Sequence, residues 1–188
     1  MNNSHDLLGD FIIFLEKIIK MKGRFEDEIF DVVDEDDNVI GQSTRKEVHD
    51  KKLIHRAVYF FIFDKNRRIF VTQRTKNKEF FKEYWSIALG GHLNTGETYD
   101  EAVVREVKEE AKIDAKPFYM GSFKLRIPEE YENVRVYGFV TDKKPELDPF
   151  EIKQGMFLTM EEMGEKIKKE KFLPETKDLL WILREFKT

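Results

Sequence analysis

Three glutamates near the middle of the chain carry the strongest chemical signal in the sequence. They are Glu106, Glu109 and Glu110, and a spacing of three or four residues places side chains on one face of a helix. Like charges that close repel one another unless a cation neutralises them. Mg²⁺, or Mn²⁺ in its place, takes carboxylate oxygens together with substrate phosphates. The cluster therefore predicts a catalytic metal site beside a phosphate-bearing substrate.

The residues before these glutamates fit the same chemistry. Gly90 and Gly91 allow the backbone to turn tightly and to come close to a ligand, so we expect them to contact substrate. Glu97 stands at the predicted entrance of the helix, where the helix dipole favours a carboxylate. It can also reach Arg105, which would hold the acidic cluster in place. The local pattern therefore indicates a strand, a glycine loop and a metal-binding helix.

Together these residues resemble the Nudix box. Its pattern is Gly, five residues, Glu, seven residues, Arg-Glu, an aliphatic residue, any residue, Glu-Glu, any residue, Gly and an aliphatic residue. The chain matches it at Gly91, Glu97, Arg105, Glu106, Val107, Glu109, Glu110 and Ile113. Lys112 replaces the second Gly, which would end the helix in a left-handed conformation, and costs about 1 kcal/mol if that backbone is kept. The departure concerns helix termination and leaves the carboxylates intact.

The resemblance extends from about residue 29 to about residue 141, and is greatest to the branch of isopentenyl-diphosphate isomerases and their hydrolase relatives. The stretch 34–41 is similar to that branch's opening strand and turn. Isomerases of this branch hold a metal with histidines and glutamates. The matching positions here are His49, His55, His92, Glu110 and Glu132. The resemblance also implies that Arg74 and Lys78 hold the diphosphate, with help from Arg45. Positively charged side chains of this kind bind phosphate groups through charge-assisted hydrogen bonds.

Two substitutions favour hydrolysis over isomerisation. The isomerase needs a cysteine beside the box, but Gly90 occupies that position and the chain has no cysteine. Val134 stands where the isomerase's catalytic glutamate is expected, although Glu132 lies two residues away on the same strand face. The complete box, by contrast, provides what metal-assisted hydrolysis of a diphosphate requires. Isomerisation and a catalytically inactive diphosphate-binding role are the alternatives.

The resemblance implies a Mg²⁺-dependent hydrolase that cleaves a diphosphate linkage in a small molecule. A box glutamate, Glu132 or Glu151 would be the general base. The expected fold is an α/β (α+β) Nudix sandwich of α/β/α layers with a mixed sheet. Trp85 is expected to pack in the core rather than to line the substrate pocket.

Hydrophobic patterns predict the elements that position these residues. Helical spacing occurs at residues 98–111, at Met160–Lys169 and at Glu175–Phe186, where Pro174 favours the first turn. Strands are predicted at Ile29–Val33, Ala57–Phe63, Ile69–Arg74, Phe118–Ile127 and Asn133–Thr141, with a turn at Asp34–Asn38. The apolar run Ala57–Phe63 indicates a strand buried on both faces. Strands, a helix, more strands and two helices are the order of an α/β sandwich.

Length and composition are consistent with this assignment. The chain has 188 residues, 40% of them apolar, which suffices for one core. The net charge of −4 gives no basic surplus, so a nucleic-acid polymer is not an expected partner. The absence of a targeting segment and of a membrane-spanning apolar run predicts a cytoplasmic protein without a membrane partner. Residues 1–24 are predicted to form a helical extension that docks on the core or on a second copy, giving a homodimer, with the Nudix domain at 25–188.

Overall fold

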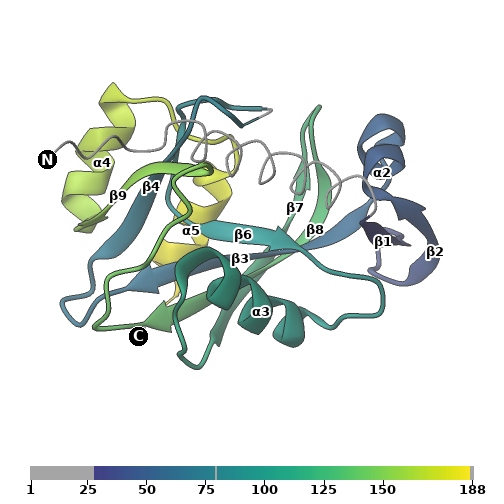
Figure 1. The fold of residues 1–188 in the computed structure, drawn as a ribbon, viewed down its shortest axis with the longest axis horizontal. Coiled ribbons are helices and arrows are strands. Elements are labelled where there is room, and N and C mark those ends of the chain that lie inside the picture. The colour runs from purple at the N-terminus through teal and green to yellow at the C-terminus, as the bar shows by residue number, and fades with distance from the viewer. Residues whose placement is uncertain (1–27, 79, 187–188) are drawn as a thin grey trace, which may run out of the picture.

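The computed structural model describes residues 28–78 and 80–186, so the predicted N-terminal helix lies outside the described residues. A mixed seven-stranded sheet is at the centre (Figure 1). Its strands are β3 (His55–Phe63), β4 (Ile69–Arg74), β5 (Trp85–Ser86), β6 (Leu89–His92), β7 (Phe118–Arg126), β8 (Tyr131–Val140) and β9 (Ile152–Leu158). The order is β5-β4-β3-β8-β7, while β6 pairs with β3 and β9 pairs with β4. Only the β3–β8 pair is parallel among these described pairings.

The remaining elements lie around this sheet. A separate hairpin is formed by β1 (Ile29–Val33) and β2 (Val39–Thr44). The helices are α2 (Arg45–Lys51), α3 (Tyr99–Ala111), α4 (Met160–Lys169) and α5 (Thr176–Glu185). None of the helices in the described ranges is long and apolar enough to cross a membrane.

Side chains of β3 divide the core into two layers. Ala57 and Phe61 belong to one cluster, which also contains Met163 of α4 and Leu179 and Ile182 of α5. Val58, Phe60 and Ile62 alternate with them and pack in a second cluster with Val103 and Val107 of α3. The sheet is thus covered by α3 on one face and by α4 and α5 on the other (Figure 1). This confirms the predicted α/β/α sandwich and the strand buried on both faces.

The structure also shows where the sequence patterns failed. The hairpin strand β2 is mostly exposed, and α2 has a single buried residue, Val48, so neither segment shows the apolar periodicity of a core element. The edge strand β9 was likewise not predicted. Pro174 lies before the N-cap residue Glu175 and therefore outside α5, rather than in its first turn. Trp85 is 2% exposed and stacks on Phe172, which confirms its assignment to the core.

The box helix α3 has a defined start and end. Thr98 and Glu101 form a reciprocal capping box at its N-terminus. Lys112 follows its last residue with a φ of 53°, the left-handed conformation that the missing glycine would have provided. The helix therefore ends as the Nudix pattern requires, with a lysine in a backbone conformation that strains a side chain.

Replacing Lys112 with glycine should relieve this strain. We expect Lys112→Gly to raise the free energy of unfolding by about 1 kcal/mol, measured by urea denaturation. The matched control is Lys108→Gly, an exposed position inside α3, which should lower it by about 1 kcal/mol. A loss of stability in Lys112→Gly would contradict the assignment of strain to this residue.

Candidate active site

Arg105 organises the acidic cluster of the box. Its Nε and Nη2 atoms donate to both carboxylate oxygens of Glu97 at 2.9 and 2.8 Å, as predicted from the sequence. Its Nη1 donates to Glu106 at 2.6 Å and lies 3.5 Å from Glu109. Nη2 also donates to the carbonyl of His92 at 2.9 Å, which ties the helix to the glycine strand β6. Bidentate pairing of this kind fixes geometry as well as charge.

Glu106 lies in a space that only glycine leaves open. A Cβ atom at Gly91 would be 2.3 Å from the Glu106 carboxyl carbon, so any larger residue there would displace the carboxylate. Burial raises the pKa of Glu106 to about 7 against the opposing effect of Arg105, and Glu110 and Glu109 raise it further. Burial also raises the pKa of Glu110. The carboxylates of α3 repel one another and lie close to the Gly91 backbone. Such a group is suited to bind a divalent cation, which would neutralise the repulsion.

A cleft of about 140 Å³ adjoins the box. Its lining includes Gly90 and Glu110 together with the predicted phosphate contacts Arg74 and Lys78. Arg74 donates from Nη2 to the carbonyl of Phe80 at 3.1 Å, but its buried Nε has no hydrogen-bond partner among the described residues. Burial lowers the pKa of Arg74. A partly buried guanidinium with an unused donor, on a residue that lines a cleft, is suited to bind an anion such as phosphate.

The other predicted phosphate ligands have partners of their own. Lys78 forms an ion pair with Glu151, so Glu151 is engaged as a counter-ion. Arg45 donates to Glu28 at 2.9 Å and lies 3.3 Å from Nδ1 of His92. The structure thus places Arg45 beside the histidines, while Arg74 and Lys78 line the cleft.

Three histidines gather beside this cleft. Donor atoms of His49, His55, His92 and Glu130 all lie within 4.8 Å of one another. Within the described part of the chain, this is the one group of three or more metal-ligand residues that is so compact. Sheet register explains it, because parallel pairing sets His55 opposite Glu132 and antiparallel pairing sets Ala57 opposite His92.

Backbone carbonyls orient two of the three imidazoles. Nδ1 of His49 lies 2.7 Å from the carbonyl of Arg45, and Nδ1 of His55 lies 3.2 Å from the carbonyl of Leu53. Nδ1–H donation to the Leu53 carbonyl leaves the Nε2 lone pair of His55 available, the arrangement that outer hydrogen bonds impose on metal-binding histidines, whereas Nε2 of His49 lies 3.1 Å from the carboxylate of Glu130. Nε2 of His55 is buried without a hydrogen-bond partner among the described residues, at 3.8 Å from Glu130.

The protonation states of two of the three histidines also favour a metal ion. Burial lowers the pKa of His55 to about 4 and that of His92 to about 3, so both are neutral at pH 7, the form that binds metals. The hydrogen bond to Glu130 instead raises the pKa of His49. Three nitrogen donors and a carboxylate are a typical donor set for Zn²⁺ or another transition metal rather than for Mg²⁺.

Glu132 connects the histidine group to the cleft. Its carboxylate accepts from the hydroxyl of Tyr59 at 3.0 Å and lies 3.1 Å from Nε2 of His92. Burial raises its pKa, and the neighbouring Glu130 raises it further. Val134, two residues on, is 2% exposed in the core and has no part in this arrangement.

Three residues of the site were not predicted from the sequence. Glu130 lies in the turn between β7 and β8, and its spacing of two from Glu132 was the only available signal. Tyr59 lies within an apolar run and was interpreted as core. Glu175 lines the cleft from the start of α5, more than 60 residues from the box, where no local pattern marks it.

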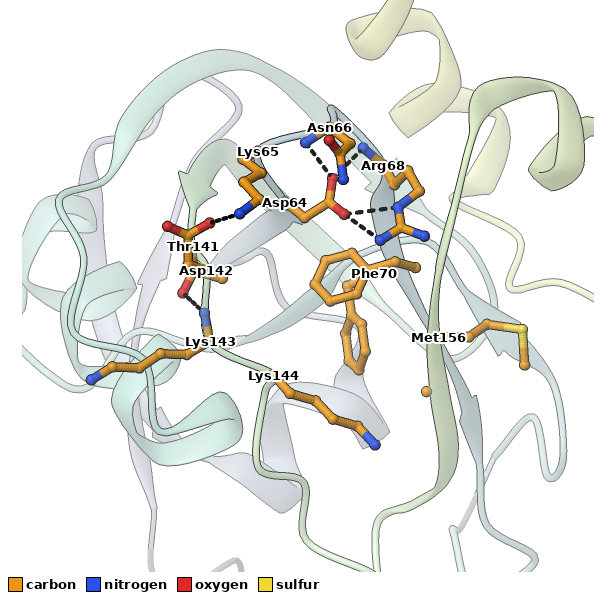
Figure 2. A pocket seen from close by; sticks show the side chains of 12 residues that line it. Asp64, Lys65, Asn66, Arg68, Phe70, Thr141, Asp142, Lys143, Lys144 and Met156 are labelled. Carbon is orange, nitrogen blue, oxygen red and sulfur yellow. Dashed lines mark hydrogen bonds and ion pairs between the residues drawn. The ribbon is translucent and has the colours of Figure 1, made fainter.

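A second hollow, of about 450 Å³, lies away from the box (Figure 2). The β3–β4 turn, the segment after β8 and part of β9 enclose it, and Lys143 and Lys144 lie at its edge. The one arginine that lines it, Arg68, is paired with Asp64 at 2.7 Å. Because no residue of the box lines this hollow, its greater size does not make it the active site.

Comparison with known proteins gives the same family. The model of the NUDIX domain matches residues 53–180. An uncharacterised Nudix hydrolase of Yersinia pestis is 34% identical over 164 residues, covering 84% of this chain and 87% of that protein. An isopentenyl-diphosphate Delta-isomerase of Serratia proteamaculans is 34% identical over 130 residues, covering 66% and 73%. A crystal structure from Deinococcus radiodurans superposes with a TM-score of 0.71 at 26% identity, covering 85% of this chain and all of that one.

The chain therefore belongs to the Nudix family. Within it, the chain is an enzyme of the Nudix pyrophosphohydrolase type, in a branch that is also similar to isopentenyl-diphosphate isomerases.

The contact between Gly91 and Glu106 can be tested directly. Gly91→Ala should displace the Glu106 carboxylate and lower kcat/KM for diphosphate cleavage by about 100-fold or more, since misplacement of about 1 Å can cost that much. The control is Gly41→Ala, where a Cβ meets nothing within 4 Å. Circular dichroism should show both variants folded, and full activity in Gly91→Ala would refute the steric argument.

Proposed function

We propose that the protein hydrolyses a diphosphate linkage in a small molecule, with Mg²⁺ or Mn²⁺ bound by Glu106, Glu109 and Glu110. The observation that supports this most strongly is the juxtaposition of the intact carboxylate cluster with a cleft that holds an unsatisfied Arg74. Glu109 is exposed and can rotate toward an ion, while Glu97 keeps Arg105 in place. The ion, when bound, would polarise the diphosphate and activate water.

The side chains of the cleft would carry out the remaining tasks. Arg74 would bind the diphosphate through its unused Nε, and Lys78, neutralised in part by Glu151, would add a second positive charge. Glu132, whose pKa is raised by burial, could accept a proton near neutral pH. Glu151 is less suited to that role, because its carboxylate is already engaged in the ion pair with Lys78.

Isomerisation is disfavoured by the space at position 90. A Cβ atom at Gly90 would lie 2.4 Å from both the Tyr59 ring and the carbonyl of Val58. This strand has no room for a side chain such as the cysteine that an isomerase would need there, unless the strand moves. The chain has no cysteine at any position that could supply the thiol instead.

One assay separates hydrolase, isomerase and binding protein. Nucleoside diphosphates, nucleotide sugars, dinucleotide cofactors and isopentenyl diphosphate are incubated with Mg²⁺ or Mn²⁺, and released phosphate or nucleotide and solvent-deuterium uptake are both measured. Glu109→Gln should lower hydrolytic turnover by about 100-fold or more without changing the melting temperature, because the side chain is exposed. Glu161→Gln, exposed on α4, is the matched control. Retained activity in Glu109→Gln would remove its catalytic assignment.

We further propose that His49, His55, His92 and Glu130 bind a separate transition-metal ion. After equilibrium dialysis against Zn²⁺ or Mn²⁺, plasma mass spectrometry should find one ion per chain in Glu109→Gln, whose box site is impaired. Adding His49→Gln to that variant should weaken this binding by more than about tenfold, whereas adding Lys51→Gln on the same helix should not. Equal binding in both double variants would exclude the histidine site.

A further inference from the structure

Glu175 is a buried acid in the cleft that the hydrolysis scheme does not use. It is 6% exposed and lines the same cleft as Arg74, Gly90 and Glu110. It precedes α5, yet its side chain makes no capping hydrogen bond to the helix. Apart from its own backbone N–H, no group in the described ranges donates a hydrogen bond to its carboxylate. A side-chain cap on the first turn of α5 therefore does not explain this residue.

A buried carboxylate that accepts, among the described residues, only from its own backbone N–H lowers the stability of the free protein. Burial raises the pKa of Glu175 to about 7, and Glu132 raises it as well, while Arg74 acts in the opposite direction. The position is thus unfavourable in the protein alone. A ligand that donates a hydrogen bond to Glu175 would offset the cost, which is how buried polar groups produce specificity.

The surroundings of Glu175 narrow the chemistry of that donor. Arg74 and Lys78 line the same cleft and would repel an ammonium group. An alkyl group would exclude water and leave the carboxylate unpaired. A hydroxyl group avoids both penalties, because it carries no charge and can donate a hydrogen bond to the carboxylate.

We propose that Glu175 determines specificity by accepting a hydrogen bond from a hydroxyl of the group attached to the diphosphate. The substrates would then be diphosphates of sugars or other polyols, and alkyl diphosphates would be rejected. This inference deepens the proposed function, on which it rests for the binding of the diphosphate.

The test measures binding in the full-length chain. Isothermal titration calorimetry with Mg²⁺ uses the Glu109→Gln variant, so that ligands are not consumed, and ADP-ribose, UDP-glucose and geranyl diphosphate as probes. At least one hydroxylated probe should bind more tightly than geranyl diphosphate. Adding Glu175→Leu should raise the Kd of that hydroxylated probe by about tenfold or more. The Kd of geranyl diphosphate should stay unchanged or fall. Adding Glu175→Gln instead, which can still accept a hydrogen bond, should keep the Kd of the hydroxylated probe within about threefold of that of the parent variant.

Controls separate recognition from folding. Glu175→Leu removes a buried carboxylate to which no other described residue donates, so the melting temperature of this variant should be no lower than that of its parent. Glu185→Leu, exposed on the same helix, should alter neither class of ligand. Equal weakening of both classes, a preference for geranyl diphosphate, or no binding of any probe would overturn the role of Glu175. Absence of phosphate release by the unmodified chain, with the binding preference preserved, would instead refute hydrolysis.

Discussion

The site depends on how the Glu106 carboxylate is held between Gly91 and Arg105. The absence of a Cβ at Gly91 gives the carboxylate its space, and Arg105, itself fixed by Glu97, gives it a counter-charge. This contact joins α3 to β6, and it fixes the Glu106 carboxylate on the same helix as Glu110, which lines the cleft. The carboxylate is thus already in place for a cation, and little reorganisation would be needed when an ion binds.

A second group of charges is created by the sheet. Parallel pairing of β3 with β8 and antiparallel pairing of β3 with β6 bring His55, Glu132 and His92 to one end of the sheet. The small helix α2 adds His49, and the β7–β8 turn adds Glu130. Phe30 of β1 stacks on His55 at 5.5 Å between ring centroids and shields the group from solvent. Glu132 and Tyr59 connect this group to the cleft, and the two proposed metal sites differ in donor chemistry.

The same scaffold is similar to both hydrolases and isomerases, so side chains rather than the fold must decide the reaction. Two positions are informative here. The tight packing around Gly90 leaves no space for a nucleophilic or acidic side chain, and Glu175, in the proposed role, would make the cleft unfavourable for a purely apolar group. Both favour hydrolysis of a polar diphosphate, and they are independent of the box that first indicated the family.

The sequence alone determined the box, because its side chains are brought together within one helix and the loop before it, where spacing fixes geometry. It also determined the central strand, whose continuous apolar run indicates burial on both faces, and the sandwich, which follows from the order of the predicted elements and from the family resemblance. The tertiary structure decided which distant residues complete the site. Glu130, Tyr59 and Glu175 come from a turn, a core strand and a helix start, and their convergence follows from strand register and helix packing that no local pattern encodes. Short polar elements such as α2 were missed for the same reason, because tertiary contacts rather than their own periodicity hold them in place.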